Sequence, residues 1–324
     1  MKGLPTILVT GANGFVGGHF LQILQAEHAG KYNIIATYLG EIPESHKISG
    51  IDWVMLDISN KSEVYSAIQK SKPDFVLHLA AVSHVPTASA AIEQTWQINV
   101  MGSLYLFEAI KEYAPECGII FVSSSEVYGE SFKDKPELDE TACLSPMNSY
   151  ASSKAAIDLL SAQLAHDGQR IIRVRPFNHV GPGQTENFVV PAFASQIARI
   201  EAGQQEEVIR VGNLSAIRDF LDVRDVVQAY IQLIENFDSI EKGSVFNIAS
   251  GNGKTISTLL DMLLEQSPAD VTVEQEAKRM RPVEINNAVG NADKLKKQIG
   301  WQPVITIEQT LTDVLTEWRS KLNS

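Results

Sequence analysis

The chain has 324 residues, of which 44% are hydrophobic and 20% charged, and its formal net charge is −12. These values are typical of a globular protein with a large core and exclude a disordered or fibrous chain. The negative charge disfavours nucleic-acid binding, because it repels phosphate backbones at long range. Cys117 and Cys143 are the only cysteines and show no CxxC spacing, so we predict no metal site and two reduced thiols rather than a disulfide.

The N-terminal half of the chain alternates short apolar runs with helical patterns. Apolar runs typical of buried strands occupy residues 7–9, 33–37, 53–56, 75–79, 118–122 and 171–174. Helical spacing is found at residues 20–24, 64–68, 104–113, 223–234 and 255–264. Continuous apolar strands separated by helices predict a parallel sheet that is covered on both faces.

No apolar run approaches the ~20 residues that a membrane span needs. The apolar stretch at residues 7–9 is short and leads into a glycine turn, unlike a signal peptide. We therefore expect a cytoplasmic protein that contacts no membrane.

A glycine-rich turn follows the first predicted strand and opens the first helix. Gly11, Gly14 and Gly17 form the pattern GxxGxxG. Glycine permits the tight turn, the close approach of a pyrophosphate and close packing of helix on strand, while the helix N-terminus offers free N–H groups to phosphates. The alternative is a plain tight turn, but the strand before the motif and the alternating units after it favour dinucleotide binding.

The end of the second strand bears on the choice between NAD and NADP. An acidic residue there would bind the ribose 2′-OH and favour NAD, whereas Thr37 and Tyr38 carry no charge. NADP is therefore the preferred cofactor and NAD is possible. Asp57 and Ile58, after the third strand, are candidates to meet the adenine, unless Asp57 only caps the next helix.

Tyr150 and Lys154 are spaced to share one face of a helix. The lysine should lower the pKa of the phenol, which could then exchange a proton with an alcohol or alkoxide. Upstream, Ser124 follows a predicted strand, at the sheet edge where such folds bind ligands. The YxxxK spacing often arises by chance, and by itself it is interpreted as a solvent-exposed helix face. Its occurrence together with the glycine loop and Ser124 favours catalysis.

Taken together, TGxxGxxG, His78-Leu79-Ala80-Ala81, Ser-Ser-Ser-Glu-Val-Tyr-Gly and YxxxK resemble the extended short-chain dehydrogenase/reductase family over nearly the whole chain. The resemblance implies a Rossmann-type doubly wound parallel sheet with a smaller, interleaved C-terminal substrate-binding subdomain. Residues 1–176 would form the dinucleotide-binding domain. Residues 177–324 would mainly bind substrate, with part of 177–250 returning to the sheet.

The family assigns roles to matching residues. Catalysis would belong to Ser124, Tyr150 and Lys154, with Asn99 supporting the lysine, which also bonds the nicotinamide ribose. The full set implied to bind the cofactor is Gly11, Asn13, Gly14, Phe15, Val16, Gly17, Asp57, Ile58, Leu79, Ala80, Ala81, Asn99, Tyr150 and Lys154.

The second half narrows the resemblance to the GDP-mannose branch. The motifs are Arg175-Pro176-Phe177-Asn178-His179-Val180-Gly181-Pro182-Gly183, then Asn187-Phe188-Val189, Arg218-Asp219-Phe220 and Arg281-Pro282-Val283-Glu284. The residues implied to bind a GDP-sugar are Ser83, Asn178, Val189, Gly212, Arg218, Arg281 and Glu284. Arginine suits a diphosphate, and a carboxylate suits the guanine edge, although Arg218 and Arg281 could instead form surface ion pairs with Asp219 or Glu284.

Two reactions fit this branch. The first is NAD(P)H-dependent reduction of the C4 ketone of GDP-4-keto-6-deoxy-D-mannose to GDP-D-rhamnose, with a proton from Tyr150. The second is a 4,6-dehydration of GDP-mannose, which needs an additional acid/base carboxylate; Glu126 occupies that place. The amino-acid sequence at residues 179–184 is more similar to that of the reductases and therefore favours the reductase. Another epimerase or dehydratase of nucleotide sugars, or a non-catalytic dinucleotide-binding protein, is a further alternative.

The family also often dimerises through a four-helix bundle. Here the bundle would use the helix around residues 104–110 and the helix around residues 150–160 of each copy. We therefore expect a homodimer.

Overall fold

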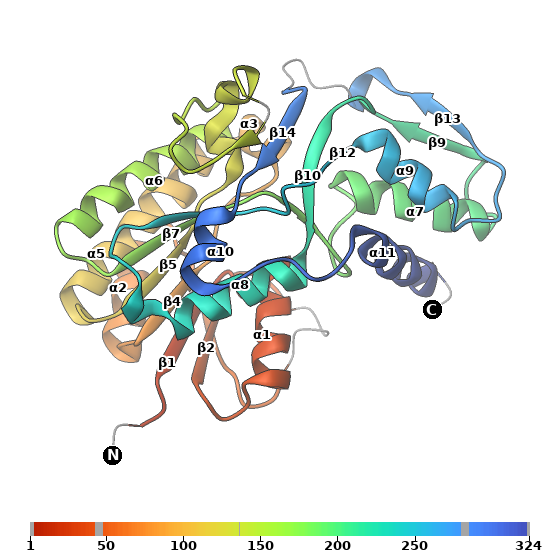
Figure 1. Ribbon diagram of the computed structural model, residues 1–324. Helices are drawn as coiled ribbons and strands as arrows, with labels where there is room; N and C mark the ends of the chain where they lie inside the picture. Colours follow the sequence, from red (N-terminus) through yellow and green to blue (C-terminus); the bar gives the residue numbers. More distant parts are fainter. Residues whose placement is uncertain (1–2, 43–47, 136, 280–284, 323–324) are drawn as a thin grey trace.

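Figure 1 shows the computed structural model, which describes residues 3–42, 48–135, 137–279 and 285–322. Its central layer is a seven-stranded, all-parallel sheet with the order β11-β7-β5-β4-β1-β2-β3. The strands of this sheet are β1 (Thr6–Thr10), β2 (Asn33–Tyr38), β3 (Asp52–Met55), β4 (Phe75–His78), β5 (Gly118–Val122), β7 (Ile171–Pro176) and β11 (Val245–Ile248). The predicted doubly wound α/β fold is confirmed.

Helices cover both faces of this sheet, as the continuous apolar strands predicted. One face packs on α1 (Phe15–Glu27) and α8 (Val223–Glu235), and the other on α2 (Lys61–Ser71), α5 (Ser103–Tyr113) and α6 (Ser149–His166). Neighbouring strand residues point to opposite cores: Ile7 and Val9 join the first, whereas Leu8 joins the second. A central strand such as β1 is therefore apolar at consecutive positions.

Polar side chains cap the N-termini of several of these helices. Asn60 accepts hydrogen bonds from the N–H groups of Ser62 and Glu63 at the start of α2, and Asn148 accepts one from Ala151 at the start of α6. Such caps satisfy N–H groups that have no partner inside the helix.

A second unit lies against the carboxyl edge of the sheet. Its strand β10 (Ile217–Asp222) pairs with β8 (Asn178–Val180), β12 (Gly253–Thr255) and β14 (Asn287–Gly290), and β14 pairs with β6 (Glu137–Leu138). Its own core lies among α7 (Val189–Glu201), α9 (Ile256–Leu264) and α11 (Ile307–Leu322), next to the two-stranded sheet of β9 (Val208–Val211) and β13 (Thr272–Gln275). The chain crosses between the units repeatedly, because α8 and β11 pack on the first sheet after β8 and β10 have joined the second.

The remaining helical segments are short or lie at the margins. They are α3 (Val85–Ala90), α4 (Ile92–Trp96), the π-helical turn η2 (Gln97–Gly102), the 3-10 segments η3 (Ser125–Lys133), η4 (Phe237–Ser239) and η5 (Ala277–Arg279), and α10 (Asp293–Ile299). The six strands and five helices named from periodicity are all present. Strands β6 to β14, apart from β7, were not predicted, because most have two to four residues and little apolar periodicity. In the part of the chain that the structure describes, no helix is long and apolar enough to cross a bilayer.

Candidate active site

The glycine turn joins β1 to α1 in a conformation that needs glycine at Gly11 and Gly17. Gly11 has φ +67°, and a Cβ there would lie 2.9 Å from the Cα of Ala80. A Cβ on Gly17 would lie 2.6 Å from the Cα of Ala12, so Gly17 lets the helix pack against the turn. Gly14 precedes the helix and offers no side-chain cap, which leaves the first-turn N–H groups of α1 available to an anion.

A cleft of about 480 Å³ opens between the glycine turn and the second unit. It brings together most of the residues named from the sequence. These are Gly11, Asn13, Gly14, Phe15, Val16, Gly17, Leu79, Ala80, Ala81, Ser83, Ser124, Glu126, Tyr150, Lys154, Asn178 and Val189. Residues from both halves of the chain therefore share one cavity at the carboxyl edge of the sheet.

Ser124, Tyr150 and Lys154 meet where β5 ends beside α6. Ser124 hydrogen-bonds the Tyr150 phenol, and its Oγ accepts a 3.2 Å bond from the N–H of Glu126. Lys154 lies one turn beyond Tyr150 and donates a 2.6 Å bond from Nζ to the carbonyl oxygen of Val122. Lys154 is thus fixed to the last residue of β5, two residues before Ser124.

Burial dominates the electrostatics of this group. It raises the pKa of Tyr150 to about 12; the bond with Ser124 lowers the pKa, and the charge of Glu126 raises it. Burial also lowers the pKa of Lys154 to about 8, against the charge of Asp158, which raises it. The expectation that the lysine lowers the Tyr150 pKa toward neutrality is wrong for this arrangement, because desolvation penalises the phenolate more than any neighbour stabilises it.

Glu126 extends into the same cleft and is tied to the helix of Tyr150. Asn148 donates a 3.2 Å bond from Nδ2 to Glu126 Oε2, while its own Oδ1 caps α6. One asparagine side chain therefore sets the position of both the carboxylate and the first turn of the helix that carries the tyrosine.

Three predicted cofactor residues lie outside the lining of the cleft. Asn99 bonds the backbone of Val82 and the hydroxyl of Ser153, and none of its described bonds reaches Lys154. Asp57 accepts bonds from the N–H and hydroxyl of Ser59, in a turn before the helix. The capping alternative for Asp57 is wrong, since Asn60 caps α2.

Ile58 is buried, and a Cβ placed on Gly102 would touch it. It therefore packs under the π-helical turn that contains Asn99 rather than along the cleft.

The predicted nucleotide-binding residues divide into two groups. Asn178 on β8 and Val189 at the start of α7 line the cleft. Gly212 and Arg218 do not line it: Gly212 packs against the backbone of Arg279, and Arg218 donates a 2.8 Å bond to the carbonyl oxygen of Ile217. Arg281 and Glu284 lie outside the described residues.

Sequence reasoning missed several residues that wall the cleft. His84 packs edge-on against Phe188 with ring centroids 5.8 Å apart, and His179 stacks on Phe15 at 6.3 Å. Tyr230, on the inner face of α8, also lines the cleft. His179 and Phe188 lie in the motifs at residues 175–189, and His84 directly follows Ser83, but only the fold shows that His84 faces Phe188 and that His179 faces Phe15.

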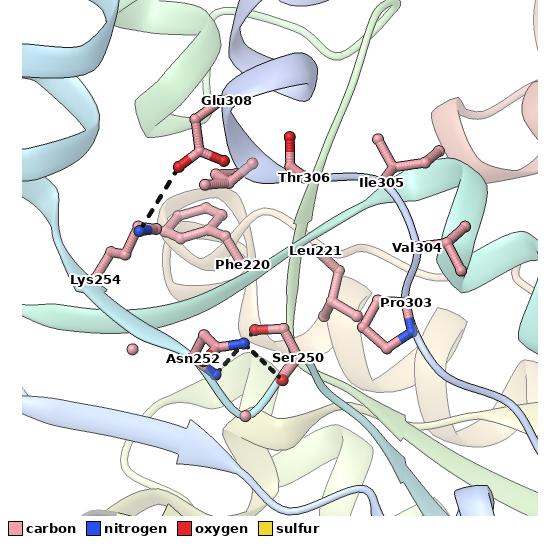
Figure 2. A pocket seen from close by; sticks show the side chains of 13 residues that line it. Phe220, Leu221, Ser250, Asn252, Lys254, Pro303, Val304, Ile305, Thr306 and Glu308 are labelled. Atoms are coloured by element: carbon pink, nitrogen blue, oxygen red, sulfur yellow. Dashed lines mark hydrogen bonds and ion pairs between the residues drawn. The ribbon is translucent and has the colours of Figure 1, made fainter.

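A second cavity of about 510 Å³ lies beside β10, between the loop at residues 250–254 and the segment 303–308 (Figure 2). Lys254 and Glu308 face each other across it, with 3.9 Å between Nζ and Oε1. The hydroxyl and N–H of Ser250 are both donated to the buried carboxylate of Asp219. Lys254 and Ser250 in this cavity are thus each paired with a carboxylate of the protein.

Comparison with known proteins agrees with this geometry. Residues 8–314 match the family model described as GDP-mannose 4,6 dehydratase. The chain belongs to this family. The predicted membership of the extended dehydrogenase/reductase family, in its GDP-mannose branch, is confirmed, and with it the expectation of an enzyme.

Two relatives and one solved structure are informative. The GDP-6-deoxy-D-mannose reductase of Pseudomonas aeruginosa is 34% identical over 317 residues, which cover 98% of each chain. GDP-mannose 4,6 dehydratase 2 of Arabidopsis thaliana is 29% identical and is aligned over 81% of this chain and 70% of its own. The structure of RMD from P. aeruginosa complexed with NADPH superposes with a TM-score of 0.83 at 32% identity, covering 98% of this chain and 99% of that one.

Proposed function

We propose that this enzyme reduces the C4 ketone of GDP-4-keto-6-deoxy-D-mannose to GDP-D-rhamnose with NADPH. The observation that carries the proposal is the single cleft in which the glycine turn, the group of Ser124, Tyr150 and Lys154, and Asn178 converge. The P. aeruginosa reductase, 34% identical along almost the whole chain, supports the choice of substrate.

The chain's own residues account for the proton transfer. A phenol whose pKa is about 12 is protonated at neutral pH and is therefore ready to act as an acid. Tyr150 gives its proton to the C4 oxygen, and Ser124 hydrogen-bonds the same oxygen as its charge develops. Lys154 holds its ammonium group beside the strand end and favours the phenolate that remains.

The cofactor site is proposed on the same face of the sheet. The free N–H groups at the start of α1 suit the pyrophosphate, and Gly11 and Gly17 let the turn pack closely against Ala80 and Ala12. When bound, the reduced nicotinamide supplies the hydride. The absence of a carboxylate at Thr37 and Tyr38, together with the NADPH of the P. aeruginosa structure, supports NADP over NAD.

The experiment is an assay of the purified enzyme with GDP-4-keto-6-deoxy-D-mannose and either NADPH or NADH. We expect loss of absorbance at the reduced cofactor's band, faster with NADPH, and GDP-D-rhamnose as the product by NMR. No oxidation of either cofactor would refute the proposal.

The 4,6-dehydratase is the second candidate, and Glu126 favours it, because its carboxylate lines the cleft beside Tyr150. A dehydratase would convert GDP-mannose with only a catalytic trace of cofactor. If wild-type enzyme leaves GDP-mannose unchanged and Glu126→Gln reduces the keto sugar at the normal rate, the dehydratase is excluded.

We also propose a homodimer that acts in the cytoplasm. Three large apolar side chains are exposed on the neighbouring helices α4 and α6: Ile92 (54%), Trp96 (39%) and Leu159 (61%). Exposed apolar side chains on two helices that pack against each other suit burial against a second copy. The free cysteines Cys117 and Cys143 are in keeping with a reducing compartment. Leu159→Glu should give a monomer by light scattering; a wild-type monomer at micromolar concentration would refute the dimer.

A further inference from the structure

A row of four buried polar residues lies next to the wall of the cleft. Thr10, at the end of β1, and His78, at the end of β4, are joined by a 2.6 Å hydrogen bond between Oγ1 and Nδ1. His78 Nε2 lies 2.8 Å from Ser103 Oγ, and Ser103 donates a 2.6 Å bond to the carbonyl oxygen of Asn99. All four residues are at most 2% exposed. The row is therefore closed to solvent and must satisfy its hydrogen bonds internally.

The carbonyl oxygen at one end fixes the direction of every proton in the row. A carbonyl oxygen can only accept, so Ser103 gives it the one hydroxyl proton it has, and Ser103 Oγ accepts from Nε2–H of His78. Burial and the charge of Lys154 lower the pKa of His78 to about 3, so the ring is neutral and Nδ1 is an acceptor. Thr10 therefore donates its hydroxyl proton to Nδ1, which leaves both lone pairs of Thr10 Oγ1 free to accept.

The two ends of the row hold the same segment of the cleft wall. Thr10 Oγ1 accepts two 3.2 Å bonds, from the N–H groups of Leu79 and Ala80. At the other end, Asn99 Oδ1 accepts a 2.8 Å bond from the N–H of Val82, and Asn99 Nδ2 donates one of 3.1 Å to the carbonyl oxygen of Val82. The residues from the first of these anchors to the last but one line the cleft.

The same asparagine ties this segment to the helix of the proposed acid. Asn99 Nδ2 also donates a 2.9 Å bond to Ser153 Oγ, and Ser153 donates a 2.8 Å bond to the carbonyl oxygen of Tyr150. The segment also lies against the glycine turn, because a Cβ on Gly11 would be 2.9 Å from the Cα of Ala80. This part of the wall therefore joins the glycine turn to the helix of Tyr150.

We propose that the row from Thr10 to Asn99 holds residues 79–82 in the position that the dinucleotide requires, an inference that rests on the proposed function. His78 is the positioning residue at the centre of the row, because a neutral imidazole offers an acceptor at one nitrogen and a donor at the other, fixed in one rigid ring. It acts on one end of the segment through Thr10 and on the other through Ser103.

The test compares two threonines that are equally buried. Thr10→Val removes the hydroxyl beside the cleft wall, whereas Thr310→Val removes one on α11 that donates a 2.8 Å bond to Asp222 and does not line the cleft. Both valine variants should melt lower than wild type, since each loses a buried hydrogen bond. The Kd for NADPH, measured by calorimetry at a temperature at which every variant is folded, separates positioning from stability.

We expect the Kd for NADPH to rise roughly three- to tenfold in Thr10→Val, the loss typical of one neutral hydrogen bond. The Kd should stay within about twofold of wild type in Thr310→Val. It should also stay within about twofold in Thr10→Ser, which keeps the hydroxyl and so rescues the row.

A second set of variants tests whether His78 and Thr10 act together. His78→Phe keeps an aromatic ring near Phe107 and Phe121 and removes both nitrogens. It should raise the Kd for NADPH about as much as Thr10→Val does. The double variant should bind within about twofold of the weaker single variant, because both changes break the same row, and losses that add in full would overturn the proposal. If His78→Phe does not fold, the comparison of the two threonines decides alone.

The remaining outcomes separate this inference from the proposed function. If wild type binds NADPH and reduces the keto sugar but Thr10→Val leaves the Kd unchanged, the inference fails alone. Equal weakening in Thr10→Val and Thr310→Val would also overturn it, because the loss would then follow general destabilisation. If wild type binds neither NADPH nor NADH, the dinucleotide-dependent function falls together with the inference.

Discussion

Replacing Asp158 by Asn should destabilise the fold more than any other single loss of charge that the structure suggests. Asp158 on α6 has a side chain that is 0% exposed. It accepts bonds of 3.0 and 2.9 Å from Nε and Nη2 of Arg175, and one of 2.9 Å from Nη1 of Arg173. Because Arg175 is itself only 5% exposed, the substitution leaves a guanidinium buried without its counter-charge.

Breaking a buried ion pair by removing one partner costs about 3–5 kcal/mol. The entropy of unfolding is about 2.1 cal/mol/K per residue, or roughly 0.7 kcal/mol/K for a chain of this length. Asp158→Asn should therefore lower the melting temperature by about 4–7 °C, measured by calorimetry at pH 7 without ligands.

The control is Asp238→Asn, which removes an ion pair between Arg170 and a carboxylate that is 85% exposed. Exposed pairs contribute about 0–1 kcal/mol, so its melting temperature should fall by no more than about 1–2 °C. Equal shifts in the two variants would refute the reasoning.

The pH dependence gives a second check on Asp158. Burial by itself raises its pKa, but the bonds from Arg175 outweigh burial, and the pKa lies below its ordinary value of 3.8. A depressed carboxylate pKa stabilises the fold above the ordinary value and loses that contribution as the pH falls through the folded pKa. The difference between wild type and Asp158→Asn should therefore be full at pH 6 and shrink as the pH falls below about 4.

Three further predictions follow from the cleft and the turns. Tyr150→Phe should lower kcat/KM by about 10²–10⁴ because the proton donor is lost, while the Kd for NADPH measured by fluorescence stays within about twofold; undiminished turnover would exclude Tyr150 as the acid. The value of kcat/KM should decline as the pH rises through about 8, because the buried Lys154 then loses its charge; a flat profile from pH 7 to 9 would contradict this. Between pH 8 and 10.5 the unfolded chain keeps the Lys154 proton that the folded chain has lost, so the free energy of unfolding should rise over that range. Gly129→Ala should lower the melting temperature far more than Gly203→Ala. Both glycines have positive φ, but a Cβ on Gly129 would collide with the Ser145 carbonyl oxygen, whereas no atom lies near a Cβ on Gly203. Similar shifts would show that only the backbone strain of a left-handed residue, about 1–2 kcal/mol, matters.

The local patterns of the sequence were sufficient for the fold class and for most of the cleft. Strand and helix periodicities identified the parallel sheet, because Leu8 and its neighbours must be apolar on both faces. The glycine turn was recognisable because its conformation admits only glycine at Gly11. Tyr150 and Lys154 could be paired because the helix repeat places them on one face.

Tertiary structure decided what depends on burial and on contacts between distant segments. The raised pKa of Tyr150 arises from desolvation, which no spacing in the sequence encodes. Arg218 was expected in the nucleotide site; it bonds the carbonyl oxygen of Ile217 and is not among the residues that line the cleft. The row from Thr10 to Asn99 became visible only once β1 and β4 had paired in the sheet, because its first hydrogen bond joins these two strands.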